Sequence, residues 1–373
     1  MTMDAAELID KKLGPQLDQT APEGGRRDVM GVSARCFLVG VIALVLAINS
    51  SETRAQEKLK VAIGASGLFF IVHYVAEGAG FFKQEGLELD TVDVTTGPRQ
   101  VAAVMGGSVD IAPLGLQLVV QATSRGGSII AISAGYTILP MSLVLSNAAI
   151  KQTGIQDGMS TNDKIARIKG LKIGITGPGS GTDDMIRTLA GTRGLDPDKD
   201  ITIQPLGNGD NMLAALEKGL TDGFVFTSPI PETAVARGLG RIVVEPLNGD
   251  VPEATGVPYI VMATNPATIQ AKRPQLVKAV RAWTNAMKFT LENKDEARRI
   301  ARSYFKQMDE AVFNAAFDKY VKGVPTHPLI TEDDVKKVGA WMSLSKKTEV
   351  VADYAVAVHP DIAREVGKSL LGK

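Results

Sequence analysis

The stretch from Lys58 to Leu118 alternates strand-like and helix-like segments, and this alternation restricts the chain to a small set of folds. An apolar run that ends at Ile63 leads into the small-residue turn Ala65-Ser66-Gly67, and a helix-like segment then extends to Gly80 before a second strand begins. A strand, a turn, a helix and a second strand form a βαβ unit. Such units bind small molecules at the carboxyl ends of their strands, where N–H groups at a helix start face outward. The stretch therefore predicts an α/β fold with a ligand site at its strand ends.

The alternation continues along the chain and predicts two α/β series. Segments 106–112 and 217–224 each end a helix with glycine, pass through an Asp and open an apolar strand. One copy would be an ordinary helix end, but two copies at matching places favour paired domains. The predicted strands are Leu59–Ile63, Leu87–Val94, Val109–Leu114, Ser128–Ser133, Met141–Ser146, Leu171–Ile175, Ile201–Pro205, Gly223–Phe226, Arg241–Glu245 and Pro258–Ala263. The predicted helices include Pro98–Met105, Asp183–Arg193, Asn211–Lys218, Pro274–Leu291, Lys294–Tyr304, Glu310–Val321 and Thr331–Ser345.

Length and charge narrow the function classes. The chain has 373 residues, which is enough for two domains, and its formal net charge is zero. Without a basic stripe it lacks the electrostatic footprint of a nucleic-acid-binding protein.

The first 55 residues predict an N-terminal extension and a cleaved signal peptide. Arg35 precedes an apolar run from Cys36 to Ile48, and Thr53-Arg54-Ala55 then offers the small residues of a cleavage site. The run is about a dozen residues long, against the roughly 20 that span a bilayer, so a permanent anchor is the weaker alternative. Translation from Met30 gives a complete signal and is the favoured start. The alternative is a start at Met1, with Arg26-Arg27 as part of a twin-arginine signal. Either start predicts export and a mature chain that begins at Gln56.

Residues 176–184 carry the strongest candidate for a ligand site. Their glycines let the backbone approach a ligand, Ser180 and Thr182 carry hydroxyls, and Gly181 lies at the start of a predicted helix whose first N–H groups have no partner within it. Together these groups predict a site for an anion. The alternative is a helix cap, formed by Ser180 or Thr182, that binds no ligand.

The matching turn of the first series, from Ala65 to Phe69, is the second candidate. Ser66 offers a hydroxyl, Gly67 belongs to the same small-residue turn, and Phe69 offers an aromatic ring. Phe69 and Phe70 can instead be core residues, and at most one of the two rings is expected to face the ligand. We expect that ring to be Phe69.

Four further residues are candidates for the same cleft. Gln117, Tyr136 and Ser228 follow strands whose ends should converge there, and the Gln117 amide can both donate and accept hydrogen bonds. Arg99, near the start of the helix after the second strand, is the candidate for a full positive charge, because its guanidinium can pair with a sulfonate or carboxylate. The alternative for each is an ordinary loop or surface residue. Without Arg99, the charge of an anion would rest on neutral donors and helix ends.

The residues favour binding over catalysis. His73, His327 and His359 are too dispersed for a metal motif, and the sequence contains neither a GxSxG elbow nor an HExxH helix. The only cysteine, Cys36, lies in the segment expected to be removed, so the mature chain has no disulfide and no thiolate metal site. A cysteine-free exported chain suits an oxidising compartment such as a periplasm. We therefore predict no catalytic residue, no metal and no cofactor.

Three phrases of the sequence resemble a known family. Residues 76–87 are AEGAGFFKQEGL, residues 107–112 are GSVDIA, and residues 194–200 are GLDPDKD. They resemble the solute-binding proteins of nitrate, sulfonate and taurine ABC importers, and the resemblance covers essentially the whole mature chain. The phrases are specific to that family and do not identify the solute.

This resemblance implies a fold, a function and partners. The implied fold is α/β, a two-lobed type II periplasmic binding protein with two doubly wound, mostly parallel sheets joined by a two-crossing hinge. Lobe 1 would comprise residues 56–138 and 257–373, including the C-terminal helices, and lobe 2 residues 139–256. The implied protein is a periplasmic monomer that captures a small anion (an alkyl or aromatic sulfonate, nitrate or a carboxylate) and delivers it to an inner-membrane permease. A ligand-binding sensor that docks on a membrane receptor and an exported enzyme are the alternatives.

The signal-peptide interpretation predicts cleavage after Ala55. Mass spectrometry of periplasmic material should give a chain that starts at Gln56, since the small residues Thr53 and Ala55 fit the recognised positions of a cleavage site. Recovery of the uncleaved chain in the membrane fraction alone would instead identify an anchor.

Overall fold

The computed structural model describes residues 56–64, 67–94, 96–346 and 350–372, so the predicted targeting segment and Ser66 lie outside the described residues. The strands are β1 (Glu57–Ile63), β2 (Leu87–Asp93), β3 (Ala112–Gly115), β4 (Ile130–Tyr136), β5 (Met141–Ser146), β6 (Lys172–Ile175), β7 (Thr202–Pro205), β8 (Gly223–Thr227), β9 (Gly240–Val244) and β10 (Ile260–Thr264). The helices of the first half are η1 (Leu68–Phe70), α2 (Ile71–Gly78), α3 (Phe81–Gln84), α4 (Gly97–Met105), α5 (Leu116–Thr123), α6 (Asn147–Thr153), α7 (Thr161–Ala166) and α8 (Gly181–Gly191). Those of the second half are α9 (Gly209–Glu217), α10 (Ile230–Ala236), η2 (Pro246–Asn248), η3 (Pro252–Ala254), α11 (Pro266–Glu292), α12 (Lys294–Arg302), α13 (Glu310–Tyr320), η4 (Val321–Gly323), α14 (Glu332–Lys346), α15 (Tyr354–Ala357) and α16 (Pro360–Leu371).

The strands form two groups that correspond to two lobes. In lobe 1, β1 pairs with β2, β10 lies between β3 and β4, and a single parallel bridge between Val61 and Ile111 links the two sets. In lobe 2 the strand order is β7-β6-β8-β5-β9. The two-lobed α/β fold predicted from the sequence is confirmed.

Strands β5 and β10 stand out because they run against their neighbours. Both follow a passage of the chain from one lobe to the other, and every pair that includes either of them is antiparallel. The other strand pairs, β1–β2, β6–β7 and β6–β8, are parallel, as expected for βαβ units. Each lobe therefore receives one crossing strand into the interior of its sheet.

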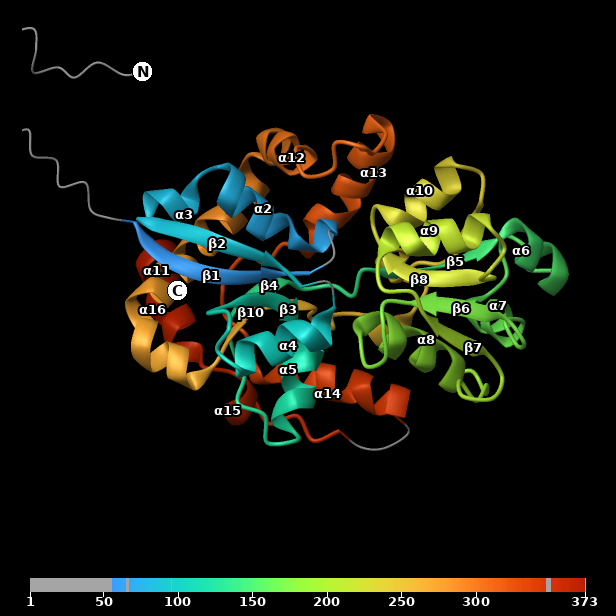
Figure 1. The fold of residues 1–373 in the computed structure, drawn as a ribbon, viewed down its shortest axis with the longest axis horizontal. Helices are drawn as coiled ribbons and strands as arrows, with labels where there is room; N and C mark the ends of the chain where they lie inside the picture. The colour runs from blue at the N-terminus through green and yellow to red at the C-terminus, as the bar shows by residue number, and fades with distance from the viewer. Residues whose placement is uncertain (1–55, 65–66, 95, 347–349, 373) are drawn as a thin grey trace, which may run out of the picture. The chain divides into compact units, whose positions relative to one another are not determined.

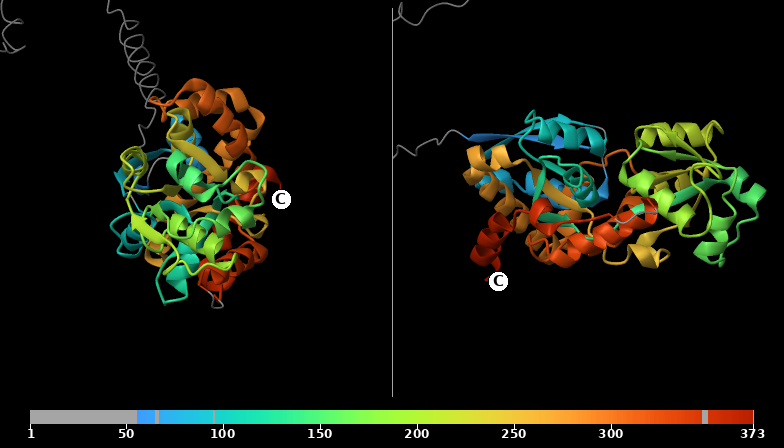
Figure 2. Two further views of the ribbon diagram at one scale, coloured as in Figure 1. Left: turned by 90° about the vertical axis from the view of Figure 1, so that its right-hand side faces the viewer. Right: turned by 90° about the horizontal axis from the view of Figure 1, so that it is seen from below.

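Helices cover both faces of each sheet (Figures 1 and 2). In lobe 1, α2, α3 and α11 pack together on one face, while α4 and α5 pack on β3 from the other. In lobe 2, α9 and α10 pack on β8 from one side and α8 packs on β5 and β8. Because both faces are covered, the strands of lobe 2 that lie inside the sheet are almost continuously apolar and buried.

Two C-terminal helices reach beyond lobe 1. Helix α13 packs on α10 and α14 packs on α8, and both α8 and α10 belong to lobe 2. Lys319 Nζ of α13 lies 3.0 Å from Glu245 Oε1 of lobe 2. The Tyr320 hydroxyl donates to the Pro140 carbonyl at 2.9 Å and accepts the Ser228 N–H at 2.8 Å. The lobes are thus joined by packed helices as well as by the short connectors that the sequence predicts.

Strand β3 is shorter than predicted because its ladder with β10 begins at Ala112, which is opposite Ala263. The expected strand Val109–Leu114 begins only at Ala112. Asp110 turns its carboxylate back to accept the Lys60 N–H at 2.8 Å and to pair with Lys272 Nζ, also at 2.8 Å. Asp110 and Ile111 therefore bond to β1 through a side chain and a single bridge, without a regular ladder between β1 and β3.

No helix in the described part of the chain is long and apolar enough to cross a bilayer.

His73 is a buried ionisable group in the core of lobe 1. Its ring lies between Phe82 and Trp283, with ring centroids 5.6 and 6.2 Å away, and only 3% of the residue is exposed. Neither ring nitrogen has a hydrogen-bond partner among the described residues. Burial disfavours the charged imidazolium and lowers the pKa of His73 to about 4.

This burial predicts a pH-dependent stability. The pKa is lower in the folded chain than the ordinary 6.5, so the stability contribution is complete above pH 6.5 and is lost progressively as the pH falls toward 4. A difference of this size corresponds to a loss of about 3 kcal/mol in the free energy of unfolding. His73→Leu should flatten that part of the pH profile measured by chemical denaturation. His327→Leu controls for the loss of a histidine as such, and identical slopes in wild type and His73→Leu would contradict the assignment.

Candidate functional site

A cavity of about 70 Å³ lies between the two lobes, at the carboxyl ends of strands from both sheets. Lobe 1 supplies the end of β1, the η1 turn, the start of α4 and the β3–α5 junction, while lobe 2 supplies the β6–α8 loop and the end of β8. The lining residues are Gly64, Phe69, Phe70, Thr96, Gly97, Gln100, Leu114, Gly115, Leu118, Thr176, Ser180, Gly181, Thr182, Phe226, Thr227, Tyr259 and Ile260. The wall thus combines aromatic and aliphatic side chains with hydroxyls and one amide, as in small-molecule sites.

Aromatic rings form much of the lobe 1 wall, and here one expectation is corrected. Both Phe69 and Phe70 line the cavity, whereas the sequence predicts at most one of them. They belong to the 3₁₀ turn η1, and their ring centroids are 4.3 Å apart. The tight turn keeps the two rings together at the edge of the cavity. Tyr259 meets Phe69 edge-on at 5.4 Å.

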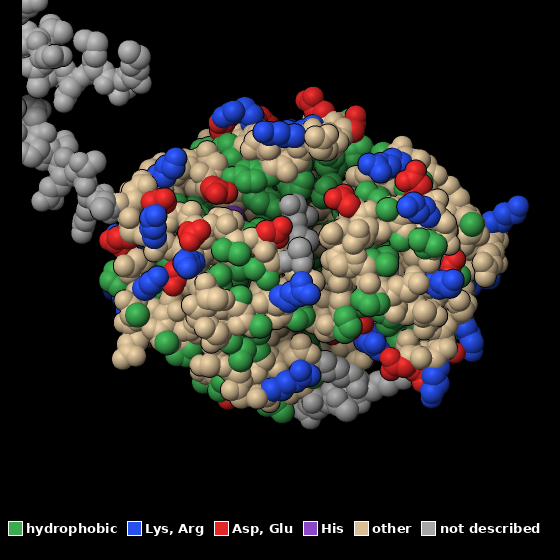
Figure 3. Space-filling model, viewed as in Figure 1, with side chains coloured by type: hydrophobic (Ala, Val, Ile, Leu, Met, Phe, Trp, Pro, Cys, Tyr) green, Lys and Arg blue, Asp and Glu red, His purple; other side chains and the backbone are tan. Residues whose placement is uncertain are grey.

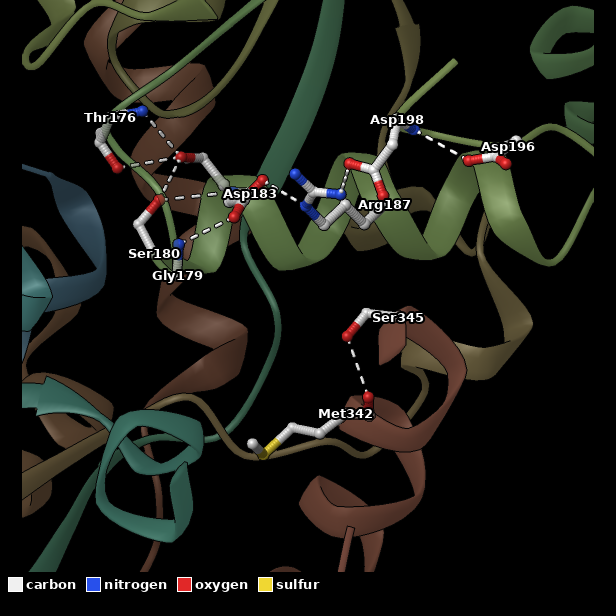
Figure 4. A network of polar contacts seen from close by, with 10 residues as sticks. Thr176, Gly179, Ser180, Asp183, Arg187, Asp196, Asp198, Met342 and Ser345 are labelled. Carbon is white, nitrogen blue, oxygen red and sulfur yellow. Dashed lines mark hydrogen bonds and ion pairs between the residues drawn. The ribbon is translucent and has the colours of Figure 1, made fainter. Parts of the chain in front are cut away.

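The hydroxyl of Thr182 is the centre of a hydrogen-bond network in the β6–α8 loop. Figure 4 shows Thr176 and Ser180, two members of this network. Thr182 Oγ1 accepts the Thr176 N–H at 2.9 Å, and it lies 2.9 Å from both Thr176 Oγ1 and Ser180 Oγ. Ser180 also caps α8 by accepting the Asp183 N–H at 3.3 Å. The three hydroxyls carry three hydrogens but make only two contacts with one another. One hydroxyl hydrogen is therefore left for a molecule in the cavity.

The loop serves as a helix cap and lines the cavity at the same time. Its own carboxylates balance the positive end of the α8 dipole, because Asp183 and Asp184 occupy the first turn and are both buried. Asp183 accepts the Gly179 N–H and the Arg187 Nε–H, each at 2.8 Å. Figure 4 shows Arg187 between Asp183 and Asp198, so its charge is used within lobe 2.

No lysine, arginine or histidine is found among the described residues of the cavity wall. Helix α4 of lobe 1 starts at the cavity, across from α8 of lobe 2. It has no acidic residue in its first turn. Thr96, at its N-cap, makes no side-chain cap bond, so the α4 start keeps donors available there. Charged side chains are scattered over the face drawn in Figure 3, without a continuous patch of either sign.

Helix α4 presents Gln100 to the cavity and Arg99 to solvent. Gln100 is 3% exposed, and it shares the buried face of α4 with Val104, one turn further along. Its Nε2 donates to the carbonyls of Ala62 at 3.2 Å and Pro113 at 3.4 Å. The sequence already contained this signal, since helical periodicity places Gln100, and not Arg99, on the face of Val104.

The other sequence candidates lie at different distances from the cavity. Gln117 is buried behind the wall, where its Nε2 lies 3.1 Å from the position that a Cβ on Gly181 would take. Gly67 is buried beside the wall, with its N–H directed to the Tyr74 hydroxyl at 3.4 Å. Tyr136 and Ser228 do not line the cavity. Tyr136 stacks on Tyr320, and Ser228 bonds to Tyr320 through its backbone N–H.

Tyr259 is a wall residue that sequence reasoning missed. It precedes β10, on the second passage between the lobes, and its backbone N–H bonds to the Tyr136 carbonyl at 2.9 Å. Burial and the nearby charge of Asp184 raise the pKa of the Tyr259 phenol, which therefore keeps its proton. In the sequence, the only sign of this role is that Tyr259 lies in the predicted strand Pro258–Ala263, because an isolated tyrosine beside a proline belongs to no motif.

A second cavity, of about 480 Å³, lies beside the first and shares Gly64 and Phe226 with it. Asp93 from the end of β2 and Asp210 from the start of α9 line it from opposite lobes, and both are exposed. Within the described ranges, no group of three or more His, Cys, Asp or Glu residues is arranged to hold a metal ion.

The network at Thr182 predicts a measurable contribution to stability. Thr182→Val keeps the shape of the side chain but leaves the Thr176 N–H and two hydroxyls without their partner. A buried polar group without its partner costs about 1–3 kcal/mol, so the free energy of unfolding should fall by that amount. Thr182→Ser keeps the hydroxyl and is the matched control. Equal stability of Thr182→Val and wild type in chemical denaturation would show that the network adds nothing.

Comparisons with known proteins agree with this architecture. Over 336 residues the chain is 23% identical to YtlA, a protein of Bacillus subtilis named as a binding protein, which covers 88% of this chain and 96% of YtlA. A solved structure of a protein from Bordetella bronchiseptica RB50 superposes with a TM-score of 0.72 at 23% identity, over 84% of this chain and 97% of that one. The alkanesulfonate-binding protein SsuA from Xanthomonas axonopodis pv. citri, bound to MOPS, superposes with a TM-score of 0.62 at 16% identity, over 81% and 98%.

A family model assigns the chain directly. The model of the NMT1-like family matches residues 54–304, which is more than half of the sequence. The resemblance predicted from the three sequence phrases is thereby confirmed, and the chain belongs to the NMT1-like family.

Proposed function

We propose that this protein is the extracytoplasmic solute-binding component of an ABC importer. The observation that carries the proposal is the cavity between the lobes, whose wall is built from strand ends and helix starts of both lobes. A ligand held there touches both lobes and so favours the closed arrangement. The family assignment and the fold shared with the sulfonate-binding SsuA support the same function. The partners would be a small molecule and an inner-membrane permease, and the protein would act as a periplasmic monomer without catalysis.

The ligand group that contacts the hydroxyl network would be an acceptor. A sulfonate, carboxylate or nitrate oxygen can take the spare hydroxyl hydrogen of Ser180 or Thr176 and the free N–H groups at the start of α4. With Arg99 in solvent and Asp183 and Asp184 at α8, such an anion would be held by neutral donors. The cavity of about 70 Å³ admits only a small group. A larger ligand would extend into the neighbouring cavity or require a greater separation between the lobes.

Closure would take place around the two chain crossings, near Tyr136–Pro140 and Gly256–Pro258. Few residues connect the sheets there, and hinges absorb large dihedral changes in such short segments. Contacts of α13 and α14 with lobe 2 would limit how far the lobes separate. A sensor that binds the same ligand and docks on a membrane receptor is the second candidate, and the same cavity would serve it.

Binding and closure can be tested together on protein purified from the periplasm. Sulfonates, carboxylates and nitrate are screened by thermal shift, because a ligand at 100 times its Kd stabilises the fold by about 2.7 kcal/mol. A ligand found in this way should reduce the radius of gyration in solution scattering and should be recovered unchanged. Phe69→Ala, which removes an aromatic face of the cavity, should weaken binding about ten-fold, whereas Phe81→Ala, whose ring packs against Phe289, should not. An unchanged scattering profile would mean a preformed site, and conversion of the ligand would overturn the binding-protein assignment.

A further inference from the structure

We propose that Gln100 selects the ligand of the central cavity by accepting a hydrogen bond from it. The ligand must then carry an N–H or O–H donor close to its acceptor group. This inference rests on the proposed solute-binding function and makes its ligand class narrower. It separates amides and amino-substituted acids from nitrate and from simple sulfonates and carboxylates.

The orientation of the Gln100 amide is determined by its neighbours. The strands β1 and β3 lie side by side, and near their ends the carbonyls of Ala62 and Pro113 point to the same place. Both are hydrogen-bond acceptors, so the amide must turn its Nε2 toward them, at 3.2 and 3.4 Å. Rotation of the amide by half a turn would place Oε1 against two carbonyl oxygens and leave both without a donor. Oε1 is therefore held on the side of the amide that faces away from these two carbonyls.

That side is the cavity. Oε1 lies 3.1 Å from the position that a Cβ on Gly64 would take, and both Gly64 and Gln100 line the cavity. Because Gly64 has no side chain, nothing from this residue covers the oxygen. No described residue donates a hydrogen bond to Oε1. Gln100, of which only 3% is exposed, thus directs a fixed acceptor without a protein partner into the small cavity.

A ligand without a donor would leave this acceptor unpaired. When an anion such as nitrate or an ionised sulfonate fills the cavity, it excludes water and brings only oxygens toward Oε1. Sites built to hydrogen-bond a ligand donor discriminate strongly against analogues that lack it, because the buried partner then loses its bond. The surrounding charge acts in the same direction. Asp93 and Asp210 line the adjacent cavity, and no described cation lines either space.

Pairs of probes in which one member carries an N–H donor and the other lacks it test the proposal. In two pairs the donor-bearing member also carries a positive charge, and the neutral amide pair controls for that charge. The pairs are taurine with propane-1-sulfonate, β-alanine with butyrate, and benzamide with N,N-dimethylbenzamide, and nitrate is added as an anion without a donor. Affinities are measured by calorimetry on protein purified from the periplasm. We expect at least one donor-bearing member to bind about ten-fold or more tightly than its partner.

Two variants connect that preference to Gln100. Gln100→Leu removes the acceptor and should bring the two members of the binding pair to similar affinity. Gly64→Ala places a methyl group 3.1 Å from Oε1 and 3.4 Å from Nε2, so it crowds the oxygen most closely, and it should reduce the same preference if Gln100→Leu fails to fold. Gln84→Leu, on the exposed surface of α3, is the matched control and should bind every probe as wild type does.

The outcomes separate this inference from the proposed function. Binding of nitrate, propane-1-sulfonate or butyrate at least as tightly as the donor-bearing probes would overturn the inference and leave solute binding intact. A donor preference that persists in both Gln100→Leu and Gly64→Ala would also overturn it. If no probe of either kind binds, the proposed binding of small anions fails, and the inference that rests on it fails with it.

Discussion

The antiparallel insertion of β5 and β10 is the constraint on which the rest of the structure depends. Each strand enters the sheet of one lobe directly after the chain has left the other, and each is hydrogen-bonded on both sides. A strand paired on both sides cannot slide without breaking two ladders, so the ends of the two crossings are fixed to the two sheets. The strand ends, and the helix starts that follow them, therefore face each other across one space. The cavity lies in that space, and its wall residues include Tyr259, at the end of the second crossing, directly before β10.

The same constraint explains the uneven composition of the wall. Loops that turn from a strand into a helix bring backbone N–H groups, hydroxyl caps and small residues to the cavity from both lobes. On α8 these donors are partly used within the loop, since Thr182, Ser180 and Asp183 bond to one another and to the backbone. On α4 the first turn has neither a side-chain cap bond nor an acid. The two lobes are therefore unequal. Lobe 2 presents a preorganised network with one free hydroxyl hydrogen, and lobe 1 presents free helix-start donors beside the fixed acceptor of Gln100.

Sequence patterns predicted the repeating elements well because local physics determines them. Each of the ten strands in the described residues overlaps a predicted strand, since apolar runs bounded by glycine and proline mark buried strands. The positions of strand ends and helix starts in the sequence also singled out four residues that line the cavity, namely Phe69, Ser180, Gly181 and Thr182. The charge of Arg99 made it the candidate on α4, whereas helical periodicity places its neighbour Gln100 on the buried face of that helix. The partners of Tyr136 and Ser228 could not be predicted at all. Both contact Tyr320, which is distant in the sequence, and these contacts arise only when α13 packs beside β4 of its own lobe and against lobe 2.

A neutral wall has a consequence for how binding and closure are linked. A cation buried in the cleft would attract an anion over long distances even when the lobes are apart. Hydroxyls, N–H groups and an amide oxygen act only at hydrogen-bond distance, and they contribute most when water is excluded. Here Gln100 lies on lobe 1 and the Thr182 network on lobe 2, so under the proposed closure neither set would surround a ligand before the lobes meet. Recognition and closure would therefore be one event, and selectivity would be expressed mainly in how long the closed state lasts.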